Sequence, residues 1–307
     1  MCKVTISAFQ LIKAFPNEEA ARNYLESLRW PDGPICPNCG SNDDQYCIKR
    51  KGVGGYFDCR ACRTVYTVRT GTIFERSHVP LDKWMFAIYQ VVTARKGISS
   101  LQLSKEIGVT QRTAWFMLQR IRKACEGDNL EGDFLFGIVE ADEVYIGGKD
   151  KNRHESKKRG HGDDKTVVLG MRERAGNVKA QVVPDAGSNL KERVAETVCI
   201  GSVVCTDEHR SYQGLPDRTH KTVCHSAKEF VNGMAHTNGI ESVWALLRRA
   251  FYGTYHSFSR KHTQLYLNEV CFRLNSGNVR AHTLERINSV LGMCFGRRLT
   301  FDTLVAG

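Results

Sequence analysis

The amino-acid sequence predicts a mixed α/β protein that contains more than one domain. The chain has 307 residues, which exceeds the usual size of a single domain. Two closely spaced pairs of cysteines near the start are typical of a small metal-binding module. After a polar stretch at residues 126–133, strand-like runs come first and then alternate with helices. This order is typical of a layered α/β domain.

The composition favours a polyanionic partner. Lys and Arg total 44 against 33 Asp and Glu, so the formal net charge is +11. Such a surplus favours nucleic acid or, less often, an anionic membrane surface, although a soluble protein without such a partner can carry it too. No apolar run approaches the roughly 18 residues that span a bilayer, and Met1–Pro16 lacks the features of a signal peptide. We therefore expect a cytoplasmic protein with no membrane partner.

The first part of the chain begins with a helix and continues into a turn-rich region. Residues 17–29 have the periodicity of an amphipathic helix, and Asn17 can act as its N-cap. Residues 55–70 alternate as in a β-hairpin. We expect an N-terminal helical segment at residues 1–30 and a small ribbon at residues 31–76.

Four cysteines in the expected ribbon have the spacing of a zinc site. Cys36 and Cys39 form one C-x2-C turn, Cys59 and Cys62 form another, and 19 residues separate the two pairs. Two such turns can aim four thiolates at one tetrahedral Zn²⁺ ion. Two redox-active pairs or unrelated buried thiols are the alternatives. Because the site would be closed, we expect the zinc to be structural.

Residues 77–125 have the pattern of a helix-turn-helix region. Gly108 separates helical patterns at residues 99–107 and 110–124. The side chains expected to face a DNA groove or its phosphates are Gln111, Arg112 and Gln119. Arg120, Arg122 and Lys123 are expected to add positive charge for the DNA backbone. An ordinary pair of packed helices is the alternative, but the basic second helix favours DNA binding.

The second half has the pattern of a sheet with helices on it. Strands are expected at residues 135–146, 165–172, 178–184, 202–206 and near 221–225, and helices at about 189–198, 239–251, 260–275 and 281–293. The run VEADEVYIGG at residues 139–148 places several acids in a strand that should be buried. Because unpaired buried carboxylates are costly, this cluster predicts cations or a wet cleft.

Three acids from separate elements are candidate ligands of divalent cations. They are Asp142 in the first of these strands, Asp207 at the end of a later strand, and Glu241 in the first turn of a helix. In a strand, Glu140 shares a face with Asp142, whereas Glu143 points to the other face. Each acid alone has an ordinary structural explanation. Their order, however, matches the ribonuclease-H-like nuclease layout, and such a set suits two Mg²⁺ (or Mn²⁺) ions bridging a phosphodiester.

Several motifs together resemble one protein family. The matching runs are WPDGPICPNCGS, RTGTIFERSHVPLDKW, KGISSLQLSKEIGVTQRTAWFMLQRIR, EADEVYIGGK, TDEHRSY and HTNGIESVWALLRRAFYGTYH. They resemble the ISXO-like insertion-sequence transposases and cover most of residues 17–275. The resemblance implies a zinc ribbon and a helix-turn-helix followed by a ribonuclease-H-like DDE domain at residues 133–275, with a helical extension at residues 276–307. It carries the catalytic roles to Asp142, Asp207 and Glu241.

The family resemblance also implies an activity and partners. Such an enzyme binds terminal inverted repeats, cleaves at the element's ends and joins the 3′-OH to target DNA. It is expected to be nucleoid-associated and to act as a homo-oligomer that brings two ends together. The residues expected to contact DNA phosphates are Lys149, Lys157, Lys158, Arg159 and Arg248. Arg248 stands where the family often has Lys. The alternative for residues 149–165 is an ordinary charged, solvent-exposed segment.

Three other functions stay open from the sequence. The chain could be a DNA-binding regulator without activity, a nuclease of the same fold acting on RNA or branched DNA, or a non-enzymatic zinc scaffold. The acids favour an enzyme over the regulator and the scaffold. The roles of Glu140, Glu143, His236 and Asn238 are left open.

Overall fold

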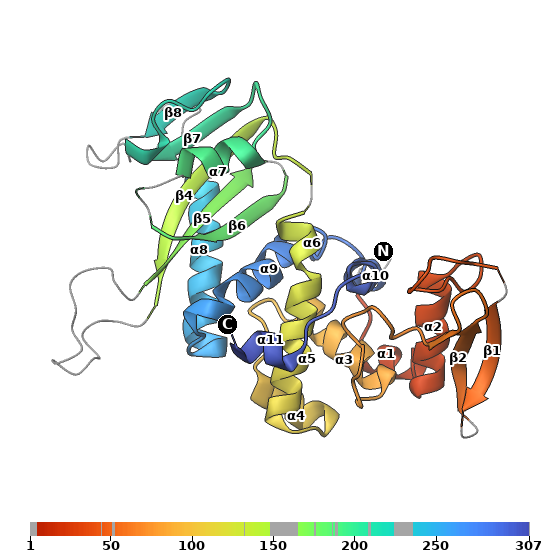
Figure 1. Ribbon diagram of the computed structural model, residues 1–307. Helices are drawn as coiled ribbons and strands as arrows, with labels where there is room; N and C mark the ends of the chain where they lie inside the picture. Colours follow the sequence, from red (N-terminus) through yellow and green to blue (C-terminus); the bar gives the residue numbers. More distant parts are fainter. Residues whose placement is uncertain are drawn as a thin grey trace. The chain divides into compact units, whose positions relative to one another are not determined.

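The computed structural model describes residues 5–43, 45–50, 53–131, 133–147, 165–174, 176–185, 187, 190–207, 210–223 and 236–306. The chain divides into two compact units (Figure 1). The N-terminal unit comprises Met1–Cys125 together with Ser276–Gly307, and the sheet unit comprises Glu126–Asn275. The C-terminal segment, expected as a separate extension, therefore belongs to the N-terminal unit.

The N-terminal unit begins with two helices and a three-stranded ribbon. Its elements are α1 (Ala8–Ala14), α2 (Glu18–Arg29), β1 (Gln45–Arg50), β2 (Val53–Cys59) and β3 (Thr64–Tyr66). The strands are antiparallel in the order β1-β2-β3, so the predicted hairpin is confirmed as β2 and β3. Asn17 caps α2 by accepting from the Ala20 amide at 2.9 Å, as expected. Trp30, which follows α2, packs its ring against Phe57 and Tyr66 of the ribbon.

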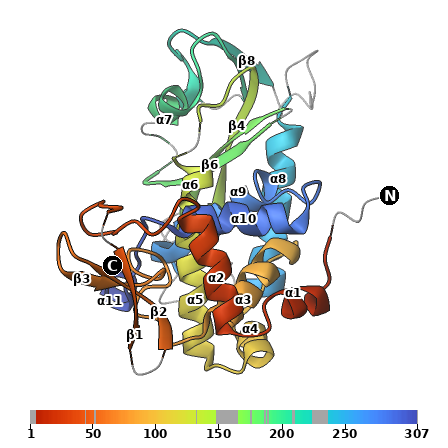
Figure 2. The same cartoon turned by 90° about the vertical axis from the view of Figure 1, so that its right-hand side faces the viewer.

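A helical bundle completes the N-terminal unit (Figure 2). It contains α3 (Leu81–Thr93), α4 (Ser100–Ile107), α5 (Gln111–Ala124), α10 (Thr283–Cys294) and α11 (Phe301–Ala306). Gly108 ends α4 with a φ of 64°, a left-handed conformation that favours glycine. Thr110 caps α5 by accepting from the Thr113 amide at 3.1 Å. Helix α10 packs against α2, α3 and α5, which brings the C-terminal residues into this unit.

The sheet unit contains one five-stranded mixed sheet. Its strands are β4 (Ile138–Ile146), β5 (Thr166–Glu173), β6 (Val178–Val183), β7 (Val203–Asp207) and β8 (Thr219–Val223), in the spatial order β6-β5-β4-β7-β8. Strands β4, β5 and β6 pair antiparallel, whereas β7 is parallel to β4, and β8 is parallel to β7. All five strands overlap the runs predicted from the sequence.

Helices cover both faces of this sheet. Helix α7 (Leu190–Thr197) packs on one face, where its Leu190 and Val194 join Val139 and Ala141 of β4 in one apolar core. Helices α8 (Asn238–Ala250) and α9 (Thr263–Leu274) contribute to a second core on the other face, with Val144 of β4. Successive β4 residues thus alternate between the two cores. Short elements complete the unit: α6 (Glu126–Asn129), η3 (Arg210–Tyr212), η5 (Phe251–Tyr255) and η6 (Arg260–His262).

Side-chain amides occupy the outer edge of β6. They come from Asn129, Gln264 and Asn275. Asn129 exchanges two hydrogen bonds of 2.8 Å with the Ala180 backbone, as a neighbouring strand would. Asn275 does the same at Val178, at 2.8 and 2.9 Å, and Gln264 accepts from the Val182 amide at 2.9 Å. The edge backbone groups of Val178 and Ala180 and the Val182 amide are therefore paired by side chains rather than by a sixth strand.

Among the described residues, no helix combines the length and the apolar character that crossing a membrane requires.

Candidate functional site

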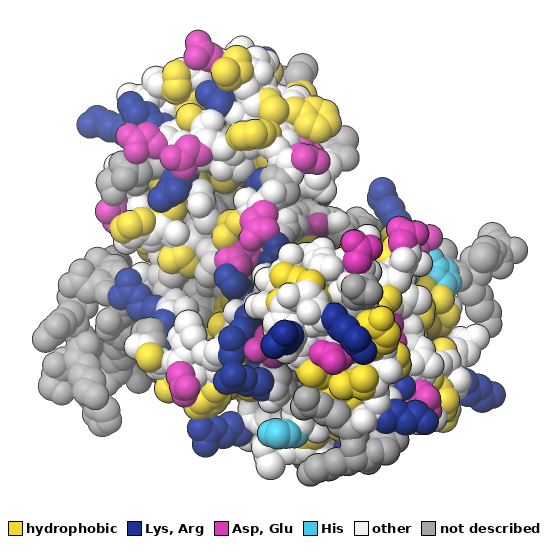
Figure 3. Space-filling view, turned by 45° about the vertical axis from the view of Figure 1, so that its right-hand side comes forward, with side chains coloured by type: hydrophobic (Ala, Val, Ile, Leu, Met, Phe, Trp, Pro, Cys, Tyr) yellow, Lys and Arg dark blue, Asp and Glu magenta, His cyan; other side chains and the backbone are white. Residues whose placement is uncertain are grey.

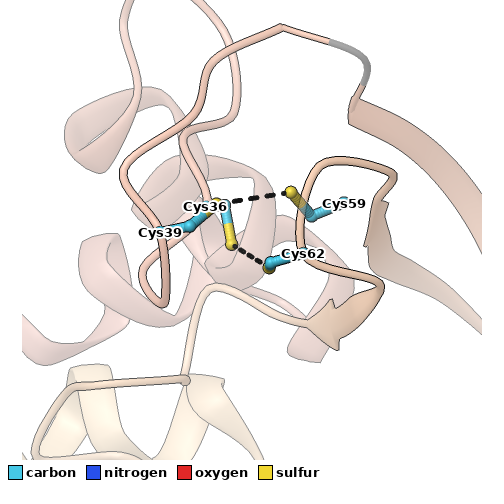
Figure 4. Close-up of side chains that lie close together, drawn as sticks. All are labelled: Cys36, Cys39, Cys59 and Cys62. Atoms are coloured by element: carbon cyan, nitrogen blue, oxygen red, sulfur yellow. Dashed lines mark hydrogen bonds between the residues drawn. The ribbon is translucent and has the colours of Figure 1, made fainter.

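The four predicted cysteine ligands meet at one point in the N-terminal unit (Figure 4). Their Sγ atoms all lie within 4.8 Å of one another. Cys36 and Cys62 are 3.6 Å apart, and Cys39 and Cys59 are 3.7 Å apart. Backbone hydrogen bonds from Gly40 to Cys36 and from Cys36 to Ser41 form the tight turn that holds the first pair.

These distances fit a tetrahedral zinc ion. With Zn–S bonds of about 2.3 Å, neighbouring sulfurs of a tetrahedron lie about 3.8 Å apart. All four positions are filled by cysteines, so the set resembles a structural rather than a catalytic zinc site. Within the described part of the chain, no other group of three or more His, Cys, Asp or Glu side chains is brought together in this way.

The first residue of the predicted acidic site, Asp142, lies at the centre of β4. The expectation that Asp142 and Glu143 point to opposite faces of the sheet is confirmed. The Asp142 carboxylate accepts a hydrogen bond of 2.9 Å from Trp244 Nε1 of α8. The Glu143 carboxylate accepts one of 2.6 Å from the Tyr212 hydroxyl, which belongs to the core on the α7 face. The side chains of Asp142 and Glu143 therefore lie on opposite faces of the sheet, and Glu143 is hydrogen-bonded to Tyr212.

Asp207 lies in the strand beside Asp142. The parallel ladder pairs Glu140 with Cys205, and continuing it by two residues brings Asp142 level with Asp207. Burial raises the pKa of Asp142 to about 6; the Trp244 hydrogen bond opposes this shift, while the charges of Glu143 and Asp207 add to it. The structure thus brings two of the predicted acids into electrostatic contact.

Glu241 occupies the first turn of α8 and is exposed to solvent. Its Oε1 accepts a hydrogen bond of 3.2 Å from the Thr237 hydroxyl. Because Trp244 follows Glu241 by three residues, the two side chains lie on neighbouring positions of one helix face. In the described residues, however, Asp142, Asp207 and Glu241 do not form a group whose carboxylate oxygens all lie within 4.8 Å. Their joint binding of metal remains a prediction.

A glycine on β5 makes room for Trp244. Gly170 pairs with Asp142 across the β4–β5 ladder. A Cβ atom added to Gly170 would lie only 2.3 Å from the Trp244 ring. The indole can therefore lie against the sheet and reach Asp142 only because this position has no side chain. The sequence predicts a buried Trp244 one turn after Glu241, but neither its contact with Asp142 nor the need for Gly170 follows from local patterns.

Charged side chains of the sheet hold the start of α8. Glu140, which is 1% exposed, accepts a hydrogen bond of 3.0 Å from the Ile240 amide. Arg172 donates to the Gly239 carbonyl at 2.6 Å and to the Ser242 hydroxyl at 2.7 Å. The open role of Glu140 is thereby resolved structurally, since it binds the backbone one residue before Glu241.

The predicted DNA-contacting residues of α5 divide into two groups. Gln111 and Arg112 are exposed at the start of the helix, and the Arg112 guanidinium lies 4.5 Å from the centre of the Phe301 ring. The expectation for Gln119 is wrong, because this side chain is fully buried and its Oε1 accepts from Arg122. The reason is that α5 packs against α3, α4 and α10, so little of its second half faces solvent.

The expected contribution of two arginines of α5 to the DNA backbone is also wrong. Arg120 and Arg122 are 7% and 1% exposed. The Arg120 guanidinium instead donates to the carbonyls of Ile73, Glu75 and Leu299, which ties the C-terminal segment to α5. These basic residues therefore stabilise the N-terminal unit from within.

The remaining predicted phosphate contacts have mixed outcomes. Arg248 is exposed near the end of α8. Lys149, Lys157, Lys158 and Arg159 lie outside the described residues. On the face drawn in Figure 3, Lys and Arg side chains are interspersed with acidic and apolar ones.

Comparisons with known proteins add the following. Residues 134–275 match the family described as ISXO2-like transposase domain, and residues 16–65 match the transposase zinc-ribbon domain. A Halobacterium salinarum protein, described as an uncharacterized protein in transposable element ISH50, is 32% identical over 258 residues, covering 78% of this chain and 84% of that protein.

Among solved structures, a match covers 62% of this chain and 65% of a chain in the simian T-cell lymphotropic virus intasome in complex with PP2A regulatory subunit B56 gamma. The identity is 13% and the TM-score is 0.29. A TM-score this low establishes no common fold.

Proposed function

We propose, from the premise that this chain belongs to the family of ISXO2-like transposases, that it cleaves DNA at the ends of an insertion sequence and joins the 3′-OH to target DNA. One observation carries the proposal. Asp142, at the centre of β4, has the Asp207 charge beside it and binds a tryptophan one turn from Glu241. This supports a site in which acids from two adjacent parallel strands and from the helix that covers them would act together.

The sheet topology supports a ribonuclease-H-like fold for the sheet unit. In chain order its strands lie 3-2-1-4-5, with the first three antiparallel and the last two parallel to the first. Helix α7 connects β6 to β7, so the crossover to the parallel side of the sheet runs through a helix. In this arrangement Asp142 lies on the central strand, which is where the proposed chemistry needs it.

We assign the metal ligands to Asp142, Asp207 and Glu241. Carboxylate oxygens are preferred ligands of Mg²⁺ and Mn²⁺, and a raised Asp142 pKa fits a site whose charges a cation would offset. Two bound ions would activate the attacking oxygen and neutralise charge on the phosphodiester. Trp244 would fix the Asp142 carboxylate, and Arg248, two turns after Glu241, would bind a DNA phosphate.

DNA recognition is assigned to the N-terminal unit. Helices α4 and α5, joined at Gly108, would form a helix-turn-helix in which Gln111 and Arg112 contact base edges or phosphates. The zinc-bound cysteines would staple the ribbon. Because two ends must be joined, the active species would be a homo-oligomer on DNA.

The test uses the full chain, a duplex carrying the element's terminal repeats, and Mg²⁺ or Mn²⁺. The wild type should cleave and join this DNA, and Asp142→Asn should abolish both steps while retaining end binding. Glu192→Gln, at an exposed acid of α7, is the matched control and should keep full activity. If wild type and Asp142→Asn both bind ends but neither joins them, a regulator replaces the transposase. Cleavage of RNA or branched DNA without joining would indicate a nuclease.

A further inference from the structure

The beginning of α8 is held by a network of buried and half-buried charges. Glu140 of β4 places Oε2 3.0 Å from the Ile240 amide, and its Oε1 lies 3.1 Å from Arg174 Nε and 3.2 Å from His236 Nδ1. Arg174 also donates to the His236 carbonyl at 3.2 Å. One carboxylate thus accepts from the helix amide and from Arg174, and Arg174 in turn binds the backbone of the segment that leads into the helix.

Arg172 holds the same turn from the neighbouring strand. Its Nη1 donates to the Gly239 carbonyl and to the Ser242 hydroxyl, at 2.6 and 2.7 Å. Arg172 also pairs with Glu140 in the β4–β5 ladder. The amides and carbonyls at the helix start are therefore bound by side chains of opposite charge, which defines both the position and the rotation of the helix.

The sequence at the helix start fits this close approach. A Cβ atom at position 239 would lie 2.5 Å from Glu140 Oε2, so Gly239 allows the carboxylate to reach the backbone. An anion at a helix N-terminus is stabilised by the unpaired amides and the helix dipole. The carboxylate thus receives partners that offset part of its desolvation.

A buried charge network of this kind is an inefficient way to gain stability. Burying a carboxylate at 1% exposure is strongly unfavourable before its partners compensate, and apolar residues of similar volume often stabilise a fold as well or better. What directed hydrogen bonds add is a defined geometry. The bound amide belongs to Ile240, and the next residue is Glu241.

We infer that Glu140, supported by Arg172 and Arg174, is a positioning residue that fixes the first turn of α8 so that Glu241 is presented to the Asp142–Asp207 pair. This inference rests on the proposed metal site. Glu140 itself contacts no substrate, since its carboxylate is occupied by the helix start. Its loss is therefore expected to weaken metal binding more than it weakens the fold.

The experiment measures Tb³⁺ binding through luminescence sensitised by Trp244, which lies against Asp142. Wild type should bind Tb³⁺, and Trp244→Phe should lose most of the signal. Glu140→Gln should raise the half-saturating Tb³⁺ concentration by about tenfold, the scale expected when a group that orients a metal ligand is removed. The concentration of Mn²⁺ that half-saturates DNA cleavage should rise in parallel, with end binding unchanged.

The matched control is Glu173→Gln. Glu173 is another buried carboxylate of the sheet, 6% exposed, and it accepts from the amides of Phe136 and Asn177 rather than from α8. The Glu173→Gln variant should lower the melting temperature, as Glu140→Gln does, but it should leave Tb³⁺ binding unchanged. An unchanged half-saturation in Glu140→Gln, or an equal shift in Glu173→Gln, would overturn the inference.

Two further measurements separate the possible failures. If Glu140→Gln does not fold, Arg172→Met keeps an apolar stem of similar length but removes the donors that bind Gly239 and Ser242, and it should raise the half-saturating Tb³⁺ concentration by about threefold. An unchanged value in that variant overturns the inference. If the wild type shows no Trp244-dependent Tb³⁺ binding, the proposed metal site fails, and the inference fails with it.

Discussion

The four cysteines and the three proposed catalytic acids are both candidate metal ligands, yet the structure assembles them to different degrees. The thiols come from two tight turns and already lie at tetrahedral spacing. The carboxylates come from β4, β7 and α8, and the described residues do not gather all three within 4.8 Å. Neutral thiols can share hydrogen bonds without a metal, whereas like-charged carboxylates repel each other. The thiol cluster is thus already assembled in the chain itself, whereas the three carboxylates would need a cation between them to come together.

The largest expected effect is at the cysteine site. Cys59→Ser, or removal of zinc by a chelator, should unfold the β1–β3 ribbon, because structural zinc contributes on the order of 10 kcal/mol to such small modules. Zinc content by elemental analysis and ribbon signals by NMR would measure the loss. Cys47→Ser is the matched control, since this exposed thiol is outside the cluster, and it should retain one zinc per chain. Full ribbon structure in zinc-free Cys59→Ser would contradict the assignment.

The next largest effect is expected from disturbing the contact between Gly170 and Trp244, the residue that binds Asp142. Gly170→Ala should lower the free energy of unfolding by about 2–3 kcal/mol, because its Cβ would overlap the Trp244 ring, which must move away from Asp142. Denaturant titration and tryptophan fluorescence would report the change. Gly253→Ala, where a Cβ would meet nothing within 4 Å, should change stability much less. Equal stability of the two variants would show that Trp244 is not confined by the sheet.

Replacing Asp142 by Asn is expected to raise the free energy of unfolding, by less than the changes above lower it. Because its native pKa of about 6 exceeds the usual 3.8, the native state binds the proton more tightly, and the free energy of unfolding falls as the pH rises through this range. Without divalent ions, Asp142→Asn should therefore be more stable than wild type by about 1–3 kcal/mol near neutral pH, and the two should converge below about pH 4. Urea unfolding across this pH range measures the difference. A destabilised variant at neutral pH would contradict the buried charge.

The smallest effect is expected at the C-terminal helix. Phe301→Ala should weaken binding to the terminal repeats by about threefold to fivefold, because an exposed cation–π contact that orients Arg112 is worth roughly 0.5–1 kcal/mol. Fluorescence anisotropy with labelled duplex would measure the affinity. Phe9→Ala, at an exposed ring of α1, serves as the control. A loss that persists in an Arg112→Ala background would show that Phe301 acts by another route.

Local patterns in the sequence were sufficient for some of these features. The C-x2-C turns predict the thiol cluster because each turn places its own two ligands, and the capped helices and alternating strands follow from short-range periodicity. Gln119 could not be placed correctly, since helical spacing does not reveal that α3, α4 and α10 cover α5. The role of Glu140 depends on α8 beginning over β4, a contact between residues 100 positions apart. Long-range contacts of this kind are what the sequence patterns left undetermined.

The amide-covered strand limits how this protein can associate with others. On the outside of β6, Asn129, Gln264 and Asn275 already bind the backbone groups of Val178 and Ala180 and the Val182 amide, so an incoming peptide would have to displace these side chains to pair with the strand. In the described part of the chain, β8 at the opposite border has β7 as its one strand neighbour. Among the described strands, pairing with a further strand would therefore displace fewer side-chain hydrogen bonds at β8 than at β6.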